Sequence, residues 1–293
     1  MTGTDPTANA ISRIERFGSV GSTNDIVRGW LAEGTPEVCV AAADEQTAGR
    51  GRAGRTWTAP PRAAVLLSCG FRPTWLAPDR AWRLGAVVSL AMCDAAEAVA
   101  GLPEGAISLK WPNDLVVEVA GPRALLTGVA TAEEASSRLA APLALRKIAG
   151  VLGESDGLGT NDPRMVVGIG INADWAAADF PPELAEGMTS LREASAGRPI
   201  DREVLLEAFL GHLEARLAAL REGFFDIATW TVRQALSGRI VRLEGYAPTE
   251  GEDLTVQGVD AATGALVVAP VGGGDLRLVH AGEVVHARLA VGV

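Results

Sequence analysis

The chain has 293 residues, 48% of them hydrophobic and 21% charged, which is enough apolar material for the core of one large or two ordinary domains. Its net charge of −10 argues against a general nucleic-acid binder, because such proteins neutralise phosphates with surplus cations. The sequence starts without a signal-peptide pattern, and its most apolar stretch, 84–102, contains acids and few bulky side chains. The three cysteines form no ligand pair or disulfide framework. We therefore expect a cytoplasmic protein without a membrane segment and with buried free thiols.

The basic residues are divided very unevenly. Only Lys110 and Lys147 are lysines, and all other members of the 26 Lys+Arg residues are arginines. A genome-wide preference for arginine codons explains most of this imbalance. In such a chain a remaining lysine marks a position where a compact ammonium serves better than a planar guanidinium. Both lysines are therefore candidate functional residues.

Residues 1–10 are polar and predict a disordered N-terminus. A helix is expected to begin at Ser22-Thr23-Asn24-Asp25, whose side chains favour helix N-termini, and to stop near Gly34. The pattern then predicts strands at 38–43 and 64–71 around a Gly/Arg loop at 49–55, a helix over about 79–99, and buried strands at 107–109, 148–152 and 166–171.

Asp201 opens an amphipathic helix with a leucine-rich stripe. After Gly238 the sequence changes to short β-prone runs separated by Gly, Asp and Pro, which is typical of a small barrel. These runs are 240–243, 254–256, 265–268, 276–279 and 284–287. We therefore predict a mixed α/β domain at 11–235 and a β-barrel-like module at 238–293.

A local positive segment stands out in this acidic chain. From Gln46 to Pro78 there are five arginines and no acid, and the arginines are densest in Gly49–Trp57. Alternating glycines let a backbone fold closely around an anion, and arginines add forked donors. An ordinary solvated turn and an RNA-binding Arg/Gly segment remain alternatives. The spacing fits neither a P-loop nor a dinucleotide fingerprint.

A second candidate motif, Lys110-Trp111-Pro112-Asn113-Asp114, follows a predicted strand. Such a sequence is also common at plain strand-to-turn junctions, but ligand sites of α/β proteins gather at strand ends. Lys147, by its local context alone, reads as a solvated residue before a strand. The three scattered histidines read as surface or structural residues, and no zinc or Ser/His/Asp pattern is present. An enzyme with this sequence would work by positioning and electrostatics.

Together the motifs resemble, in order and approximate spacing, those of the biotin–protein ligase family. The matching segments are Ser22-Thr23-Asn24, Gln46-Thr47-Ala48-Gly49-Arg50-Gly51-Arg52 with Gly54-Arg55 and Trp57, Lys110-Trp111-Pro112-Asn113-Asp114, Lys147-Ile148-Ala149-Gly150-Val151-Leu152, Val167-Gly168-Ile169-Gly170-Ile171-Asn172 and Thr189-Ser190-Leu191.

This resemblance implies an α+β fold. Its mixed-sheet catalytic domain would be of the class II aminoacyl-tRNA synthetase type, followed by a small SH3-like barrel. It also implies a two-step ligase reaction: biotin and ATP form biotinyl-5′-AMP and pyrophosphate, and a lysine of a biotin carboxyl carrier protein then takes the biotinyl group. ATP and biotin are the expected substrates, and Mg²⁺ is expected to assist.

The resemblance also assigns roles to residues, with Lys110, Arg50 and Arg52 as the catalytic cations. Asp114 would orient the acceptor lysine, and the metal ligands are not identified. The biotin-binding residues would be Ser22, Thr23, Asn24, Gln46, Arg50, Gly51, Arg52 and Lys110. The ATP and adenylate residues would be Arg52, Arg55, Trp57, Asn113, Lys147 and Asn172.

Two features depart from the family pattern. Too few residues precede Ser22 for the winged-helix domain of bifunctional members, so we expect a monofunctional ligase that does not bind DNA. Residues 118–146 are longer than the expected turn and predict a flexible insertion or an added helix. The alternatives are a lipoate or octanoate ligase on the same fold and, in another class, a non-catalytic repressor or nucleic-acid binder. The Gly-Arg-Gly-Arg loop and the C-terminal module favour biotin.

Overall fold

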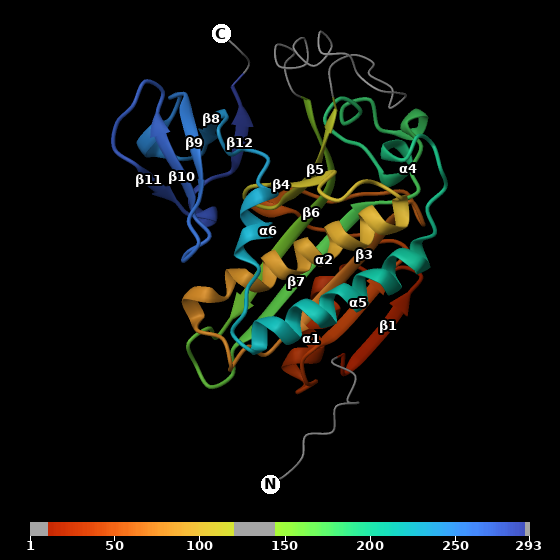
Figure 1. Ribbon diagram of the computed structural model, residues 1–293. Coiled ribbons are helices and arrows are strands. Elements are labelled where there is room, and N and C mark those ends of the chain that lie inside the picture. The colour runs from red at the N-terminus through yellow and green to blue at the C-terminus, as the bar shows by residue number, and fades with distance from the viewer. Residues whose placement is uncertain (1–10, 120–143, 291–293) are drawn as a thin grey trace.

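The computed structural model describes residues 11–119 and 144–290 and contains two sheets (Figure 1). The larger sheet has the order β1-β2-β3-β7-β6-β5-β4, and all of its pairs are antiparallel except β1 with β2. The predicted α+β architecture with a mixed sheet is confirmed. The strands of the larger sheet are β1 (Arg13–Phe17), β2 (Cys39–Ala43), β3 (Ala64–Phe71), β4 (Ile107–Lys110), β5 (Asp114–Val119), β6 (Ala144–Asp156) and β7 (Arg164–Asn172).

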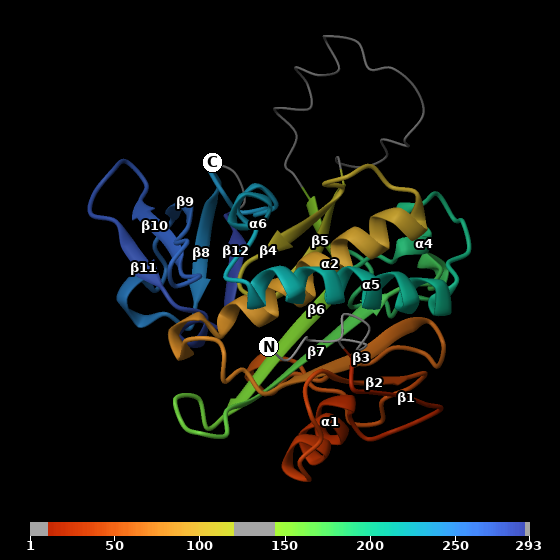
Figure 2. The same cartoon turned by 60° about the horizontal axis from the view of Figure 1, so that its bottom comes forward.

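Helices cover both faces of this sheet (Figure 2). Helices α2 (Trp82–Ala100) and α5 (Arg202–Arg221) lie on one face, and α1 (Thr23–Ala32) lies on the other. Alternate strand residues point to opposite faces, so Val40 and Leu67 join the large core with α2 and α5, while Cys39 packs with α1. As predicted, the Asp201 side chain caps α5, accepting from the backbone N–H groups of Glu203 and Val204. Two short helices, α4 (Leu191–Ala194) and α6 (Ile227–Val232), complete this part of the chain.

The larger sheet contains more strand than the sequence pattern indicates. β1 is an edge strand whose sequence mixes charged and apolar residues, so it gives no apolar run. β5 starts directly after the Pro-Asn turn, and β6 begins at Ala144 although Arg146 and Lys147 interrupt its apolar run. Residues 118–119 and 144–146 of the predicted insertion therefore belong to strands. The rest of the insertion, like the predicted disordered residues 1–10, lies outside the described residues.

The smaller sheet is antiparallel with the order β11-β10-β9-β8-β12, and each predicted C-terminal run overlaps one of its strands. It has its own apolar core, which also takes in Trp111 from the end of β4. The Trp111 indole N–H donates to the Gly264 carbonyl at 3.2 Å and so ties the two sheets together. The strands are β8 (Ile240–Glu244), β9 (Leu254–Val259), β10 (Leu266–Pro270), β11 (Arg277–Val279) and β12 (His286–Leu289).

The composition-based expectations are tested in part. All three cysteines are free and buried, as predicted. In the described ranges, no helix combines the length and apolar composition needed to cross a membrane.

Candidate active site

A cavity of about 530 Å³ is lined by the start of α1, the Gly/Arg loop, strands β4 to β7 and, from the smaller sheet, β12. Every residue that the sequence assigned to biotin, adenylate or acceptor lysine lines this cavity. They are Ser22, Thr23, Asn24, Gln46, Arg50, Gly51, Arg52, Arg55, Trp57, Lys110, Asn113, Asp114, Lys147 and Asn172.

The alternating Gly-Ile pattern of β7 explains how one strand serves both the core and the cavity. Ile169 and Ile171 point into the large core. On the opposite face, a Cβ at Gly168 would lie 2.2 Å from Asn24 Oδ1, and a Cβ at Gly170 would lie 2.7 Å from the Trp57 ring. Neither position has room for a side chain, so the glycines make space for the two cavity residues.

Neutral polar side chains are bonded to one another at one end of the cavity. Gln46 Oε1 accepts from the Thr23 backbone N–H at 2.7 Å and from its hydroxyl at 3.0 Å. The Ser68 hydroxyl lies 2.7 Å from Thr23 Oγ1 and 2.5 Å from Asn24 Oδ1, and the Asn24 amide donates to Glu154 at 2.6 Å. This end is a rigid array of hydroxyl and amide groups suited to a neutral polar ring.

The start of α1 explains why these residues face the cavity. The helix begins where the sequence predicts, with Ser22 at the N-cap, but the Ser22 side chain makes no capping hydrogen bond. Thr23 and Asn24 are buried and direct their polar atoms into the network instead. Residues typical of a helix cap therefore serve the cavity here.

Arg50 is held by carboxylates. Its guanidinium donates to Asp25 at 2.7 and 2.9 Å and to Glu154 at 3.3 Å, and Arg28 bonds the same two acids. Hydrogen bonding from Arg50 lowers the pKa of Asp25, and the bond to Asp25 raises the pKa of Arg50. These contacts fasten the Gly/Arg loop to α1 and β6, and the catalytic role of Arg50 stays a prediction.

Arg52 joins the same loop to the smaller sheet. It donates to Asn113 Oδ1 at 3.4 Å, to the Val284 carbonyl at 2.9 Å and to the Ala281 carbonyl. Burial lowers its pKa. Inside the loop, the Gly51 N–H donates to the Arg55 carbonyl at 2.6 Å. The loop is thereby held over the cavity by contacts on both sides.

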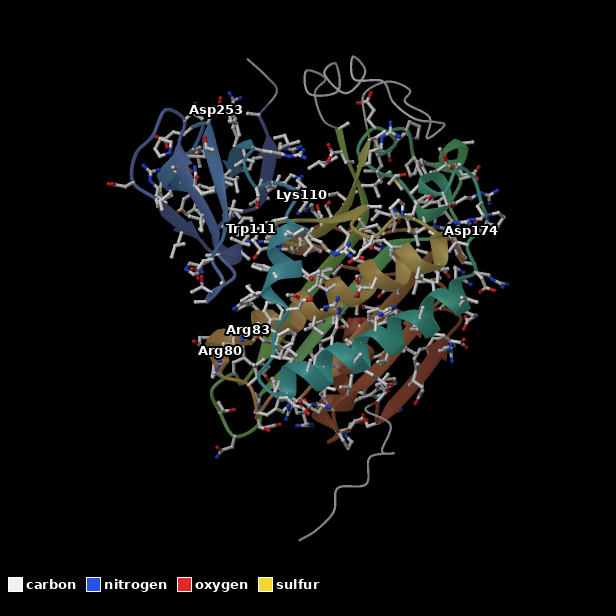
Figure 3. All side chains as sticks on the ribbon, in the orientation of Figure 1. Arg80, Arg83, Lys110, Trp111, Asp174 and Asp253 are labelled. Carbon is white, nitrogen blue, oxygen red and sulfur yellow. The ribbon has the colours of Figure 1, made fainter. Side chains whose placement is uncertain are left out.

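Lys110 lies at the end of β4, half-buried beside the smaller sheet (Figure 3). Burial lowers the pKa of its ammonium, nearby Asp114 opposes that effect, and the positive charges of Lys147, Arg288 and Arg55 add to it. Among the described residues, no hydrogen bond or ion pair engages the Lys110 side chain. Its ammonium is therefore available to an anion, whose negative charge would raise the pKa of Lys110 again.

Lys147 lies inside β6, so its local interpretation as a solvated residue ahead of a strand is wrong. Its Nζ lies 2.6 Å from Asp114 Oδ1 and 5.3 Å from the centre of the Trp57 ring. Among the residues that the structure describes, none bonds the buried Trp57 indole N–H. Gly150 and Gly170, opposite each other on β6 and β7, leave room for the indole.

Asn172 ends β7 at the edge of the cavity and is almost fully buried. Its amide donates to the Thr189 carbonyl at 2.9 Å, next to the Ser190 side chain that caps α4. The segment 189–191 therefore fixes the orientation of Asn172. This contact links two of the motifs named in the sequence.

Sequence reasoning missed Glu154, His286 and Arg288. Glu154 bonds Asn24 across 130 positions of the chain, and His286 and Arg288 reach the cavity from β12. From the sequence alone, His286 reads as a surface or structural residue. No local signal marks these residues, although the alternating glycines of β7 do mark the face on which the cavity lies.

His286 predicts a pH-dependent stability. Burial, with the Lys110 charge second, lowers the pKa of His286 from 6.5 to about 4, so the unfolded chain binds the proton more tightly. Stability is expected to fall as the pH drops from 6.5 towards 4. The urea midpoint of His286→Gln should fall less between pH 7.5 and 4.5 than that of the unsubstituted chain. Equal losses in both proteins would contradict this account.

The donor set of the cavity suits anions rather than a bare metal ion. Within the part of the chain that the structure describes, no group of three His, Cys, Asp or Glu side chains is arranged to hold one. Lys110, Arg52, Arg55 and Arg288 all line the cavity. It therefore offers cationic binding groups for phosphates and carboxylates.

The chain matches known proteins over most of its length. Residues 17–172 match the family model described as biotin/lipoate A/B protein ligase family. A biotin–[acetyl-CoA-carboxylase] ligase of Mycobacterium tuberculosis is 30% identical over 279 residues, covering 94% of this chain and 90% of that protein. One from Paracoccus denitrificans is 31% identical over 255 residues, with coverages of 83% and 89%.

A solved structure has the same fold. The biotin protein ligase from Aquifex aeolicus in complex with biotin and ATP aligns with a TM-score of 0.70 and 24% identity, over 95% of this chain and 99% of that one. Fold, family model and curated relatives agree along the chain. The chain belongs to the biotin/lipoate A/B protein ligase family.

Proposed function

We propose that this chain is an ATP-dependent biotin–protein ligase, which makes biotinyl-5′-AMP and passes the biotinyl group to a lysine of a biotin carboxyl carrier protein. One observation carries the proposal: one cavity is lined by the neutral polar side chains around Thr23, by the Lys110 ammonium and by the Trp57 ring, over which the Lys147 ammonium lies. A ligand with a neutral ring, a carboxylate and an attached nucleotide matches this set of groups. The curated relatives that span most of the chain are named biotin ligases.

The first step needs charge neutralisation rather than a base. A biotin carboxylate is ionised at pH 7, since carboxyl groups titrate near about pH 4. Its oxygen attacks the α-phosphorus of ATP, a new P–O bond forms, and the bond to the β-phosphate breaks to release pyrophosphate. Lys110 lines the cavity, and its charge offsets the repulsion between the two anions. Arg52, Arg55 and Arg288 stabilise the charge that collects on the phosphates.

The two ends of the cavity position the reactants. The hydroxyl and amide groups of Thr23, Asn24 and Gln46 supply donors and acceptors for the ureido ring of biotin. The adenine lies on the Trp57 side, where the unpartnered indole N–H and the Asn172 amide are polar groups that a base edge can meet. Correct placement of two reacting groups lowers the barrier without further chemistry.

In the second step a neutral lysine amine of the carrier attacks the biotinyl carbonyl. The amide bond forms, the bond to the phosphate breaks and AMP leaves, while the proton lost by the amine is released to bulk solvent with it. Asp114 is buried at the cavity and paired with Lys147, so it orients the incoming amine as a hydrogen-bond acceptor. Water must stay out until the carrier arrives, because the mixed anhydride hydrolyses.

The loop contact of Arg52 gives a prediction about retention of the intermediate. Arg52→Ala removes the bonds that hold the Gly/Arg loop to Asn113 and the smaller sheet, so biotinyl-5′-AMP should escape into solution. Free adenylate in the filtrate after one turnover measures this escape. Arg80→Ala, on the exposed surface outside the cavity, is the matched control. Equal release by the two variants would count against a closing role for the loop.

Purified chain, ATP and an apo-carrier domain, with either biotin or lipoate, test the proposed function. Incorporation of biotin into one carrier lysine is the expected outcome. The family model includes lipoate ligases, so lipoate is the informative competitor. Lipoate transfer without biotin transfer would overturn the proposal.

The finer features of the fold, partners and cofactors belong to the same proposal. We assign residues 11–235 to a catalytic domain of the class II synthetase type and 238–293 to an SH3-like barrel. Five short antiparallel strands with their own apolar core support the second assignment. Mg²⁺ would enter with the nucleotide and neutralise charge on its phosphates, and no protein cage would be required to hold it.

A further inference from the structure

The outer edge of β4 is occupied by a segment that is distant in the sequence. On one side Leu109 pairs with Leu115 of β5. On the other side the Leu109 N–H donates to the Arg233 carbonyl at 2.7 Å, and the Ala235 N–H donates to the Leu109 carbonyl at 2.8 Å. The residue immediately before Lys110 therefore bonds the 233–235 segment through both of its backbone polar groups, while the other edge of its strand pairs with β5.

A buried ion pair also holds this strand at Ile107, two residues before Leu109. The side chains of Arg233 and Glu97 are 4% and 5% exposed, and the guanidinium donates to the two carboxylate oxygens at 2.6 and 2.9 Å. Arg233 also donates to the Ile107 carbonyl at 2.9 Å, and Glu97 accepts from the Ile107 N–H at 2.8 Å. Both polar groups of the Ile107 backbone are thus bound by this pair.

The residue after Lys110 is anchored as well. Trp111 is 5% exposed, packs in the core of the smaller sheet and donates to the Gly264 carbonyl. Figure 3 places Lys110 and Trp111 where the end of β4 meets that sheet. The Lys110 side chain itself has no hydrogen bond or ion pair among the described residues, so its location follows from its backbone.

We propose that the Arg233–Glu97 pair is a positioning element, which fixes β4 so that the Lys110 ammonium stays in the cavity that it lines. A buried ion pair is weak evidence of stabilisation, because desolvation offsets its attraction. The function that we assign to this pair is therefore to position β4, and not to stabilise the fold. The link between this ion pair and catalysis rests on the proposed ligase reaction. The effect of the pair on the position of Lys110 does not depend on that reaction.

Because the chain has only two lysines, the effect of the ion pair on Lys110 can be measured directly. Reductive methylation with ¹³C-formaldehyde labels Lys110, Lys147 and the N-terminal amine, and Lys110→Arg and Lys147→Arg assign the lysine signals. Burial lowers the pKa of Lys110. Loss of the pair should let β4 shift and water reach the ammonium, so the titration midpoint of the Lys110 signal should rise in Arg233→Met.

Arg216→Met is the matched control. Arg216 donates to Asp94 at 2.6 and 2.9 Å in the same charged cluster, and no bond of its side chain reaches β4. This variant loses an ion pair but should leave the Lys110 midpoint unchanged. Glu97→Gln is a milder second variant that keeps an acceptor for Ile107, and a smaller rise is expected from it.

Single-turnover adenylate formation completes the test. Misplacement of a catalytic group by about 1 Å lowers the reaction rate by about 10²-fold. A loss of that order in kcat is therefore expected for Arg233→Met, with little change in the KM for biotin. Arg216→Met should stay close to the unsubstituted rate. An unchanged Lys110 midpoint in both Arg233→Met and Glu97→Gln would overturn the proposal. If the chain made no adenylate at all, the ligase function would fail while the NMR comparison still tested the positioning of Lys110.

Discussion

Lys110→Arg is expected to slow biotinyl-5′-AMP formation by about 10²–10³-fold, the loss typical when one preorganised charge-stabilising group is removed. The exchange keeps the positive charge but replaces a compact ammonium with a wider planar group. The backbone cannot move to compensate, because Leu109 and Trp111 are anchored on either side. Charge alone is therefore insufficient at this position.

Pre-steady-state measurement of adenylate and pyrophosphate checks this result. Arg80→Lys provides the reverse exchange at an exposed position outside the cavity and should leave the rate unchanged. Far-UV circular dichroism confirms that both variants fold. Near-normal adenylation by Lys110→Arg would remove Lys110 from the reaction centre.

Gly168→Ala should weaken biotin binding by about 10- to 100-fold, because a buried polar group left unsatisfied costs about 1–3 kcal/mol. The new Cβ would lie 2.2 Å from Asn24 Oδ1, which Ser68 holds at 2.5 Å. Asn24 must move, and its bond to Glu154 breaks with it. The substitution should therefore disrupt the hydrogen bonds at the neutral polar end of the cavity.

Titration calorimetry with biotin measures this loss. Gly153→Ala is the matched control, since Gly153 lies on the neighbouring strand β6 and its new Cβ would meet only Met165 Cε at an ordinary 3.5 Å. That variant should bind biotin as the unsubstituted chain does. Equal affinity of the two variants would place biotin away from Asn24.

Much of the fold follows from local patterns in the sequence. Residues 166–171 are predicted as a buried strand, and the structure confirms this within β7. The leucine stripe after Asp201 predicts α5 for the same reason, because helical spacing places apolar residues on one face. The secondary structure of strongly periodic segments can therefore be predicted from their own residues.

The missed features depend on partners that are distant in the chain. The edge strand β1 has no apolar run and is recognisable only through its pairing with β2. Glu154 bonds the cavity residues Asn24 and Arg50 from β6, and His286 lines the cavity from β12, contacts that depend on the fold and not on spacing. Spacing in the sequence carries no information on such contacts.

The charges of the chain are distributed unevenly around the cavity. The net charge of −10 describes the whole chain, while the cavity is lined by a cluster of cations whose nearest acids are bound to particular partners. Asp25 and Glu154 hold Arg50, and Asp114 holds Lys147. Of the two lysines, Lys110 alone is without such a partner among the described residues.

In this cavity the carboxylate of biotin is joined to the α-phosphate of ATP. Exchange of labelled pyrophosphate into ATP measures this step directly, without a carrier protein. We expect exchange that requires biotin, is not supported by lipoate, and is slowed by about 10²–10³-fold in Lys110→Arg. Absence of biotin-dependent exchange in the folded chain, or exchange supported by lipoate alone, would contradict this expectation.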